Sequence, residues 1–105
     1  MLFRSVGRGH EGGDPEAAPR ERMTLRPTTR FASEYAKLTG LLQRRVDKVL
    51  ELLLSNPRHP SLHVKKMKGY ENRWELRVTL NYRLTFTLDA DAYVLLRVGT
   101  HDVLR

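Results

Sequence analysis

Residues 74–89 read WELRVTLNYRLTFTLD, and this stretch decides the fold class of the chain. The apolar Trp74, Leu76 and Val78 alternate with charged residues, and the same alternation resumes over residues 82–89. A period of two residues is typical of a β-strand with one buried face, because successive side chains point to opposite sides of a sheet. We therefore predict two antiparallel strands that form a hairpin.

Further strands are predicted on both sides of this hairpin. A turn at residues 89–91 leads to a last strand, because the alternation starts again after it. The two faces of this strand are predicted to carry Val94, Leu96 and Val98 on one side and Tyr93, Leu95 and Arg97 on the other. Residues 62–67 are predicted to form another strand. A short first strand is expected within residues 24–31, at a sheet edge, where Pro27 is tolerated.

Two helices are predicted before the hairpin. Ser33 is a suitable N-cap for a helix that starts at Glu34 and is interrupted at Gly40. A second helix follows, because apolar residues recur at spacings of three and four until Asn56-Pro57 ends the pattern. These apolar positions are Leu42, Val46, Val49, Leu50 and Leu53. The predicted fold class is α+β, with an antiparallel sheet of about four strands packed on an N-terminal helical hairpin.

Charge and composition restrict the classes of partner and of chemistry. The chain has 105 residues, enough for one domain, and its net charge of +7 favours a polyanionic partner such as nucleic acid or an acidic protein. Cysteine is absent, which excludes disulfides, thiol catalysis and cysteine-based zinc sites. No stretch approaches the roughly 20 apolar residues that a membrane-spanning helix needs, so we expect a cytoplasmic protein.

Residues 1–22 differ from the rest of the sequence. They are rich in glycine and proline, and their charges sum to zero, so the positive excess lies in residues 23–105. Few of their side chains are apolar, so burial would not repay the entropy of ordering them. We predict a disordered tail or an upstream extension of the reading frame, with Met23 as the functional start of a single domain.

The face of the sheet opposite the helices is predicted to be basic. It would present Arg73, Arg77, Arg83 and Arg97, with His101 projecting from the same side just after the last strand. Guanidinium groups bind phosphate and stabilise the charge that develops during phosphodiester cleavage, while an imidazole titrates near neutral pH and can transfer a proton. RNA supplies its own nucleophile, the 2′-hydroxyl, so neither a metal nor another cofactor is required. The competing interpretation is a solvated strand face with an ordinary surface histidine.

A second basic cluster precedes the hairpin. Lys65, Lys66 and Lys68 are followed closely by Tyr70, which indicates a track for an RNA backbone with an aromatic ring available for stacking. The same lysines would equally suit a charged sheet edge that discourages aggregation. Acidic residues do not accompany the histidines at ligand spacing, so no metal site is predicted.

Four motifs, taken in order, resemble the RelE/ParE superfamily of toxins from toxin-antitoxin pairs. They are Lys-Lys-Met-Lys-Gly-Tyr at 65–70, Trp-Glu-Leu-Arg-Val at 74–78, Tyr-Arg-Leu-Thr-Phe at 82–86 and Arg-Val-Gly-Thr-His-Asp-Val-Leu at 97–104. The resemblance spans residues 24–105, and the Gly-Thr-His ending is similar to the YafQ branch. It implies a RelE-like microbial RNase fold.

The resemblance also implies an activity, namely metal-independent cleavage of messenger RNA in the ribosomal decoding site by attack of the 2′-hydroxyl. His101 is placed like the C-terminal histidine that acts as a general acid or base in YafQ-type toxins. Arg83 is placed like an arginine that contacts the scissile phosphate in the YoeB relatives. The position of a further family acid-base residue falls on Ser61, so His63 or His59 is a candidate for the base.

These considerations yield two main hypotheses. The first is an mRNA endoribonuclease with catalytic residues His101, Arg83, Arg77 and His63, and with RNA bound by Lys65, Lys66, Lys68, Tyr70, Arg73 and Arg97. The second is a ParE-like toxin that inhibits DNA gyrase by binding, because a shared fold does not fix function. A basic RNA-binding module without activity is a third possibility. The family resemblance implies a cognate antitoxin, expected to wrap the helical hairpin or the basic face with an acidic segment.

Overall fold

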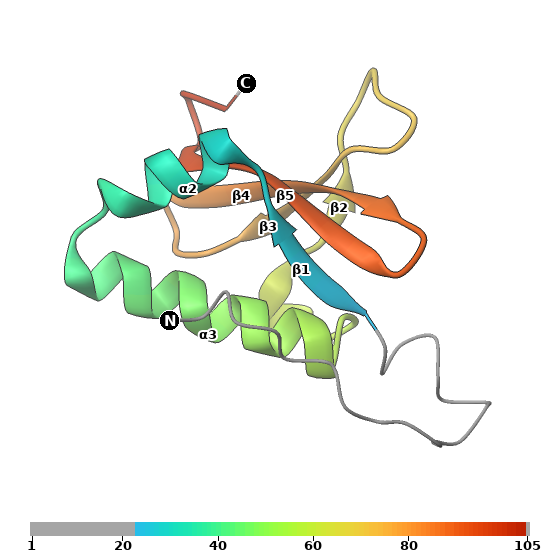
Figure 1. Cartoon of the computed structure of the whole chain (residues 1–105), viewed down its shortest axis with the longest axis horizontal. Helices are drawn as coiled ribbons and strands as arrows, with labels where there is room; N and C mark the ends of the chain where they lie inside the picture. Colours follow the sequence, from blue (N-terminus) through green and yellow to red (C-terminus); the bar gives the residue numbers. More distant parts are fainter. Residues whose placement is uncertain (1–22, 105) are drawn as a thin grey trace.

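The computed structural model describes residues 23–104, which form a five-stranded sheet with two helices (Figure 1). The predicted tail at residues 1–22 lies outside the described residues. None of the helices in the described part of the chain is long and apolar enough to cross a lipid bilayer.

The sheet is mixed rather than antiparallel, and it has five strands rather than about four. Its strands are β1 (Thr24–Pro27), β2 (Lys65–Lys66), β3 (Trp74–Arg77), β4 (Tyr82–Asp89) and β5 (Ala92–Thr100), in the spatial order β1-β5-β4-β3-β2. The other neighbours are antiparallel, but β1 pairs with β5 in parallel. A parallel pair needs a long crossover connection, and the helices and the hairpin between β1 and β5 provide it. The strand predicted at residues 62–67 is reduced to two residues.

The two helices begin earlier than predicted. Helix α2 spans Thr29–Ala36 and α3 spans Gly40–Ser55. The hydroxyls of Thr28 and Thr39 accept hydrogen bonds from the backbone N–H groups three residues later, so these threonines are the N-caps. The predicted cap Ser33 therefore lies inside α2, and Gly40 opens α3 instead of interrupting a helix.

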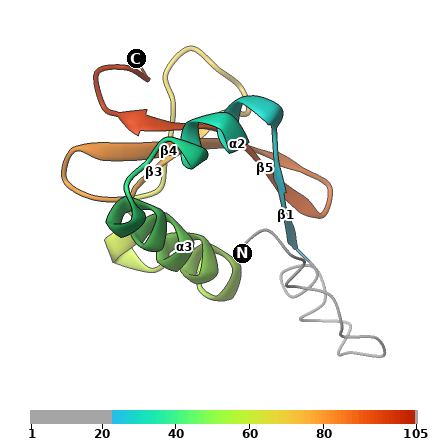
Figure 2. The same cartoon turned by 60° about the vertical axis from the view of Figure 1, so that its left-hand side comes forward.

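The core lies between α3 and one face of the sheet. Figures 1 and 2 show α3 beneath that face, whereas α2 lies beside β5. The two helices therefore do not cover the sheet as one layer, although α2 also packs against β5. Phe31 and Tyr35 of α2 still reach the core. The core is completed by Val46, Leu50 and Leu53 of α3, by Leu62 of the 3-10 helix η1 (Pro60–Leu62), and by Leu76, Val78, Leu84, Phe86, Tyr93, Leu95 and Val98.

A β-bulge in β5 changes which side chains face the core. Thr85 pairs with Arg97 whereas Phe86 pairs with Leu95, so Leu96 is an extra residue between them. An extra residue reverses the alternation of a strand at that point. Tyr93 and Leu95 are therefore buried together with Val98. The prediction that Val94, Leu96 and Val98 share one face was wrong for this reason.

Candidate nucleic-acid interface

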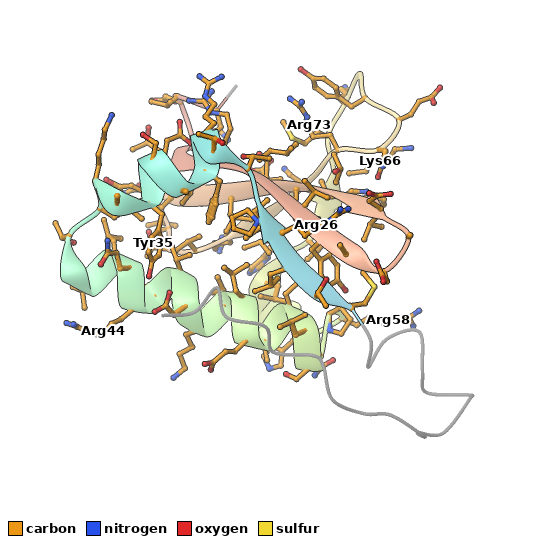
Figure 3. All side chains as sticks on the ribbon, in the orientation of Figure 1. Arg26, Tyr35, Arg44, Arg58, Lys66 and Arg73 are labelled. Carbon is orange, nitrogen blue, oxygen red and sulfur yellow. The ribbon has the colours of Figure 1, made fainter. Side chains whose placement is uncertain are left out.

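The residues predicted to bind RNA line one open groove of about 690 Å³, which we call the basic groove. It runs from β2 across β3 and β4 to β5 on the side of the sheet opposite α3. Its lining residues are Lys65, Lys66, Met67, Lys68, Tyr70, Arg73, Glu75, Thr85, Arg97 and Leu104. The cross-strand pairs of Lys65 with Glu75, Glu75 with Thr85 and Thr85 with Arg97 form a row across its floor. Figure 3 shows Lys66 and Arg73 on the same side of the molecule.

The loop between β2 and β3 holds the aromatic ring of the groove. Its ends are joined by a hydrogen bond of 2.8 Å from the N–H of Met67 to the carbonyl of Arg73. Gly69 has a φ of +88°, a conformation that glycine adopts without strain, so the chain can turn sharply there. The guanidinium of Arg73 lies 4.4 Å from the ring centroid of Tyr70 in a cation–π contact. Tyr70 is 48% exposed, so its ring is accessible to a nucleobase.

Arg97 lines the basic groove, but its guanidinium is already bound to a carboxylate. Its Nε and Nη2 donate hydrogen bonds of 3.1 and 2.8 Å to Oε2 of Glu34 on α2. Oε1 of Glu34 accepts a third hydrogen bond, of 3.0 Å, from the backbone N–H of Val98. Burial raises the pKa of Glu34, but the hydrogen bonds from Arg97 and Val98 and the positive charges of Arg97 and Arg30 outweigh it, so the pKa lies below its ordinary value. The pair favours a structural role for Arg97.

His101 and Arg83 line a second cavity of about 640 Å³, which we call the histidine cavity. Its lining residues are Leu80, Asn81, Tyr82, Arg83, Thr100, His101 and Asp102. The backbone N–H of His101 donates a hydrogen bond of 3.0 Å to the carbonyl of Asn81, so the end of β5 is fixed to the β3–β4 turn. The imidazole is 47% exposed, and its Nδ1 lies 3.9 Å from a carboxylate oxygen of Asp102.

Arg83 is anchored by the turn that it follows. Its Nη1 donates hydrogen bonds of 2.8 and 2.9 Å to the carbonyls of Thr79 and Leu80, and one of 3.2 Å to its own neighbour Tyr82. Its Nε lies 3.4 Å from Oε2 of Glu75. Because Glu75 lines the basic groove and Arg83 the histidine cavity, this ion pair joins the two sites.

Arg77 and His63 are not in the histidine cavity. Arg77 stands directly opposite Arg83 in the β3–β4 register, as the strand alternation predicts. Both Arg77 and His63 nevertheless line a third cavity, beside α3. His63 has a φ of 49°, in the left-handed region, at the end of η1. His59 is also outside the histidine cavity, and its Nδ1 accepts a hydrogen bond from the backbone N–H of Ser61. The predicted catalytic set is therefore divided between two places.

Glu34 and Glu75, which pair with the arginines of the interface, were missed by the sequence analysis. Glu75 alternates in phase with Arg73 and Arg77, so its position on the basic face was readable from the pattern. Glu34 gave no such signal, because its contact with Arg97 depends on the path of α2 beside β5.

Comparison with known proteins identifies the fold. No protein-family model matches the sequence, and no curated protein matches it. Among solved structures, a RelB–RelE antitoxin–toxin complex from Methanococcus jannaschii aligns with a TM-score of 0.63 at 21% identity, over 75% of this chain and 93% of the other. YafQ from E. coli aligns with a TM-score of 0.62 at 15% identity, over 78% and 97%.

A third structure, the E. coli DinJ–YafQ toxin–antitoxin complex, aligns with a TM-score of 0.64 at 15% identity, over 79% of this chain and 97% of the other. The resemblance read from the four motifs is thereby confirmed at the level of the fold. The chain has the α+β fold of the RelE and YafQ structures.

Proposed function

We propose that this protein is the toxin of a toxin-antitoxin pair and acts as a metal-independent endoribonuclease on ribosome-bound mRNA in the cytoplasm. The observation that carries the proposal is that His101 and Arg83 line one cavity, joined through Glu75 to a groove with five further cationic side chains. The fold is that of toxins, and its basic groove has the charge that an RNA backbone requires.

The chemistry assigns a role to each part of the interface. Lys65, Lys66 and Lys68 bind phosphates, and Tyr70 stacks on a base. The 2′-hydroxyl of the substrate attacks the adjacent phosphorus as the bond to the 5′-oxygen breaks. His101 takes the proton of the 2′-hydroxyl or gives one to the departing 5′-oxygen, water makes the other proton transfer, and the products are a 2′,3′-cyclic phosphate and a 5′-hydroxyl. Arg83 stabilises the charge on the phosphate oxygens, with the part of its guanidinium that the turn carbonyls and Glu75 do not occupy.

Arg77 and His63 do not support the same step, since they line a different cavity from His101. Arg97 supports RNA binding only indirectly, through the shape of the groove, because Glu34 neutralises it. We therefore assign the reaction to His101 and Arg83.

The proposed partner is a cognate antitoxin. Solved structures with this fold include complexes of a toxin with its antitoxin. The positive charge of the present chain suits an acidic protein. A small acidic reading frame beside the gene would agree with this assignment.

The direct test is to map the 5′ ends of cellular messages after brief induction of the full chain and of His101→Ala. We expect new 5′ ends within reading frames for the wild type, and cleavage about 10²- to 10⁴-fold slower for the variant. Glu51→Gln, on the exposed face of α3, is the control and should cleave like the wild type. Unchanged cleavage by a folded His101→Ala would refute the assignment of His101. Filamentation with DNA damage and intact messages would instead identify a gyrase inhibitor.

A further inference from the structure

The loop between β2 and β3, residues 67–73, projects from the sheet on the side away from α3 (Figures 1 and 2). Its residues lie outside the helices and strands. Met67, Lys68, Tyr70 and Arg73 of this loop line the basic groove, so the loop supplies much of one wall. The position of the loop therefore determines the position of the aromatic ring in the groove.

The side chain of Asn72 attaches the loop to the sheet. Its Nδ2 donates a hydrogen bond of 2.9 Å to the carbonyl of Leu88, and its Oδ1 accepts one of 3.1 Å from the N–H of the same residue. The indole Nε1 of Trp74 donates a further hydrogen bond, of 3.3 Å, to Oδ1 of Asn72. Because two donors face the oxygen and an acceptor faces the nitrogen, only one orientation of the amide satisfies all three contacts.

These contacts take the place of a strand residue. Trp74 pairs with Phe86, so two residues further along the same register Asn72 stands opposite Leu88, near the end of β4. A strand residue at that position would meet the N–H and the carbonyl of Leu88 with its own backbone. The side-chain amide of Asn72 carries the same two kinds of group and meets them instead. The backbone of the loop therefore leaves the sheet while the loop stays attached to it.

Two contacts inside the loop orient the ring of Tyr70. The N–H of Tyr70 donates a hydrogen bond of 3.4 Å to the carbonyl of Met67, which closes the turn around Gly69. The guanidinium of Arg73, the neighbour of Asn72 in the sequence, covers one face of the ring. The residue is nevertheless 48% exposed. A ring that is backed by a cation and fixed to the sheet is suited to stack on one flat, unpaired base.

We propose that the loop at residues 67–73 is a preformed receptor for one unpaired base of single-stranded RNA, and that Asn72 is the positioning residue that holds the ring of Tyr70 at the groove. The proposal rests on the proposed function, because it names what the basic groove takes from RNA besides phosphates. The bases of a duplex are already stacked on their neighbours, so a paired region offers the ring no free base. The amide of Asn72 is occupied within the protein, so this residue acts through Tyr70 and Arg73.

The test separates the bases of the RNA from its phosphates. The full chain is titrated with a labelled 2′-O-methyl oligoadenylate of about eight nucleotides, in which the blocked 2′-oxygen prevents cleavage. The second probe is a chain of tetrahydrofuran phosphates of the same length, which carries the charges without the bases. Anisotropy measures both affinities, and a 2-aminopurine in the first probe reports stacking by a loss of fluorescence. We expect the wild type to prefer the base-bearing probe by about 5-fold or more.

Asn72→Ala should weaken binding of the oligoadenylate about 3- to 10-fold, the result expected when the ring is in place for a third to a tenth of the time. The loss of 2-aminopurine fluorescence should shrink as well, whereas the affinity for the base-free probe should change less than about 2-fold. Asn72→Asp keeps the shape and the acceptor but lacks the donor. Its added charge affects both probes, so the ratio of the two affinities should show the same selective loss.

A double variant tests whether Asn72 acts through Tyr70. Tyr70→Ala should remove most of the preference for the base-bearing probe. Adding Asn72→Ala to it should then change the affinity less than about 2-fold, because no ring remains to be positioned. Two controls should bind like the wild type. Asn56→Ala changes an exposed asparagine at the end of α3, and Tyr35→Phe removes a hydrogen bond between the two helices.

Equal affinity of the wild type for both probes would overturn the receptor. Folded Asn72 variants that keep the preference, or that lose affinity equally for both probes, would overturn the role of Asn72, as would losses that multiply in full in the double variant. A matching loss in Tyr35→Phe would show that lower stability alone explains the effect. The message-cleavage experiment reads out the nuclease separately. A chain that prefers the base-bearing probe but cleaves no message keeps the receptor and loses the proposed function.

Discussion

Glu34 on α2 and Arg97 on β5 form the best-connected ion pair of the described structure, with two hydrogen bonds between the guanidinium and one carboxylate oxygen. The β1 strand pairs with β5 only as far as Leu95, and just beyond it the Glu34 carboxylate binds the backbone N–H of Val98. A single side chain thus takes the place of a neighbouring strand at this edge, and it neutralises the guanidinium of Arg97.

Replacing Glu34 should destabilise the fold. Glu34→Ala is expected to lower the free energy of unfolding by about 1.5–3 kcal/mol, because it leaves the Val98 N–H and a half-buried guanidinium unpaired. Glu34→Gln should cost less, since its amide oxygen still accepts a hydrogen bond. Urea denaturation at pH 7 provides the measurement. A change below about 0.5 kcal/mol for Glu34→Ala would contradict the structural role.

The ionisation of Glu34 should also make the stability of the fold depend on pH in the acid range. The pKa of Glu34 is lower in the folded state than its ordinary value of about 4.3, so its contribution is complete above that value and is lost as the pH falls through the folded pKa. The advantage of the wild type over Glu34→Gln should therefore shrink as the pH falls from about 5 to below 4. A constant difference over that range would mean that the carboxylate is not the stabilising form.

The hydrogen bond of Tyr35 leads us to expect a loss of folding stability at high pH. Its hydroxyl donates a hydrogen bond of 2.7 Å to Asp47 on α3, and Figure 3 shows the ring directed from α2 toward α3. The pKa of Tyr35 is raised to about 12, chiefly by burial and further by the hydrogen bond to Asp47 and the negative charge of Asp47. Its contribution is present below the unfolded value of about 10 and is lost as the pH rises through the folded pKa.

Tyr35→Phe should therefore lower stability at neutral pH by about 0.5–1.5 kcal/mol and remove part of the loss between about pH 10 and 12. Tyrosine absorbance at 295 nm, recorded for both proteins, measures the titration. If one tyrosine titrating near pH 12 persists in Tyr35→Phe, the assignment to Tyr35 is wrong.

Glu75 is predicted to restrain RNA binding. It is the only acidic side chain among those that line the basic groove, and it pairs with Arg83. Glu75→Gln removes the negative charge and frees the Nε of Arg83, so the affinity for a single-stranded RNA oligonucleotide should rise about 2- to 10-fold at low salt. Filter binding measures the affinity. Weaker binding would indicate that Glu75 chiefly positions Arg83.

The lysines of β2 should strengthen RNA binding by releasing counterions from the phosphate backbone, which makes the affinity depend on salt. Lys66→Ala is expected to reduce the slope of log K against log salt by about 0.7, the value for one lost contact to a single strand. Lys48→Ala, outside the basic groove, is the matched control and should leave the slope unchanged. Equal slopes for both variants would mean that Lys66 serves only as a charged sheet edge.

The strand content was predictable from the sequence, because the alternation over residues 74–89 fixes β3 and β4 locally. The sequence did not reveal which side chains of β5 face the core, because the bulge at Leu96 is visible only in the pairing of β5 with β4. The parallel pairing of β1 was also hidden, because it depends on contacts between residues about 70 positions apart.

The residues of the candidate site were likewise predictable only in part. The groove residues were found because neighbouring strands place them in rows, and Arg77 stands opposite Arg83 as the alternation predicts. His63 could not be placed in this way, because it follows η1 with a left-handed backbone and lines the cavity beside α3 with Arg77. Their role in catalysis remains a prediction that the separation of the cavities disfavours.

The pairing of β1 with β5 bears on how the protein is made. The first described strand finds its place only beside the last, so the sheet cannot be completed until residue 95 has left the ribosome. His101 follows six positions later, directly after the last residue of β5. During synthesis the sheet therefore stays incomplete until most of β5 has emerged, and any function that depends on the assembled sheet begins only after that point.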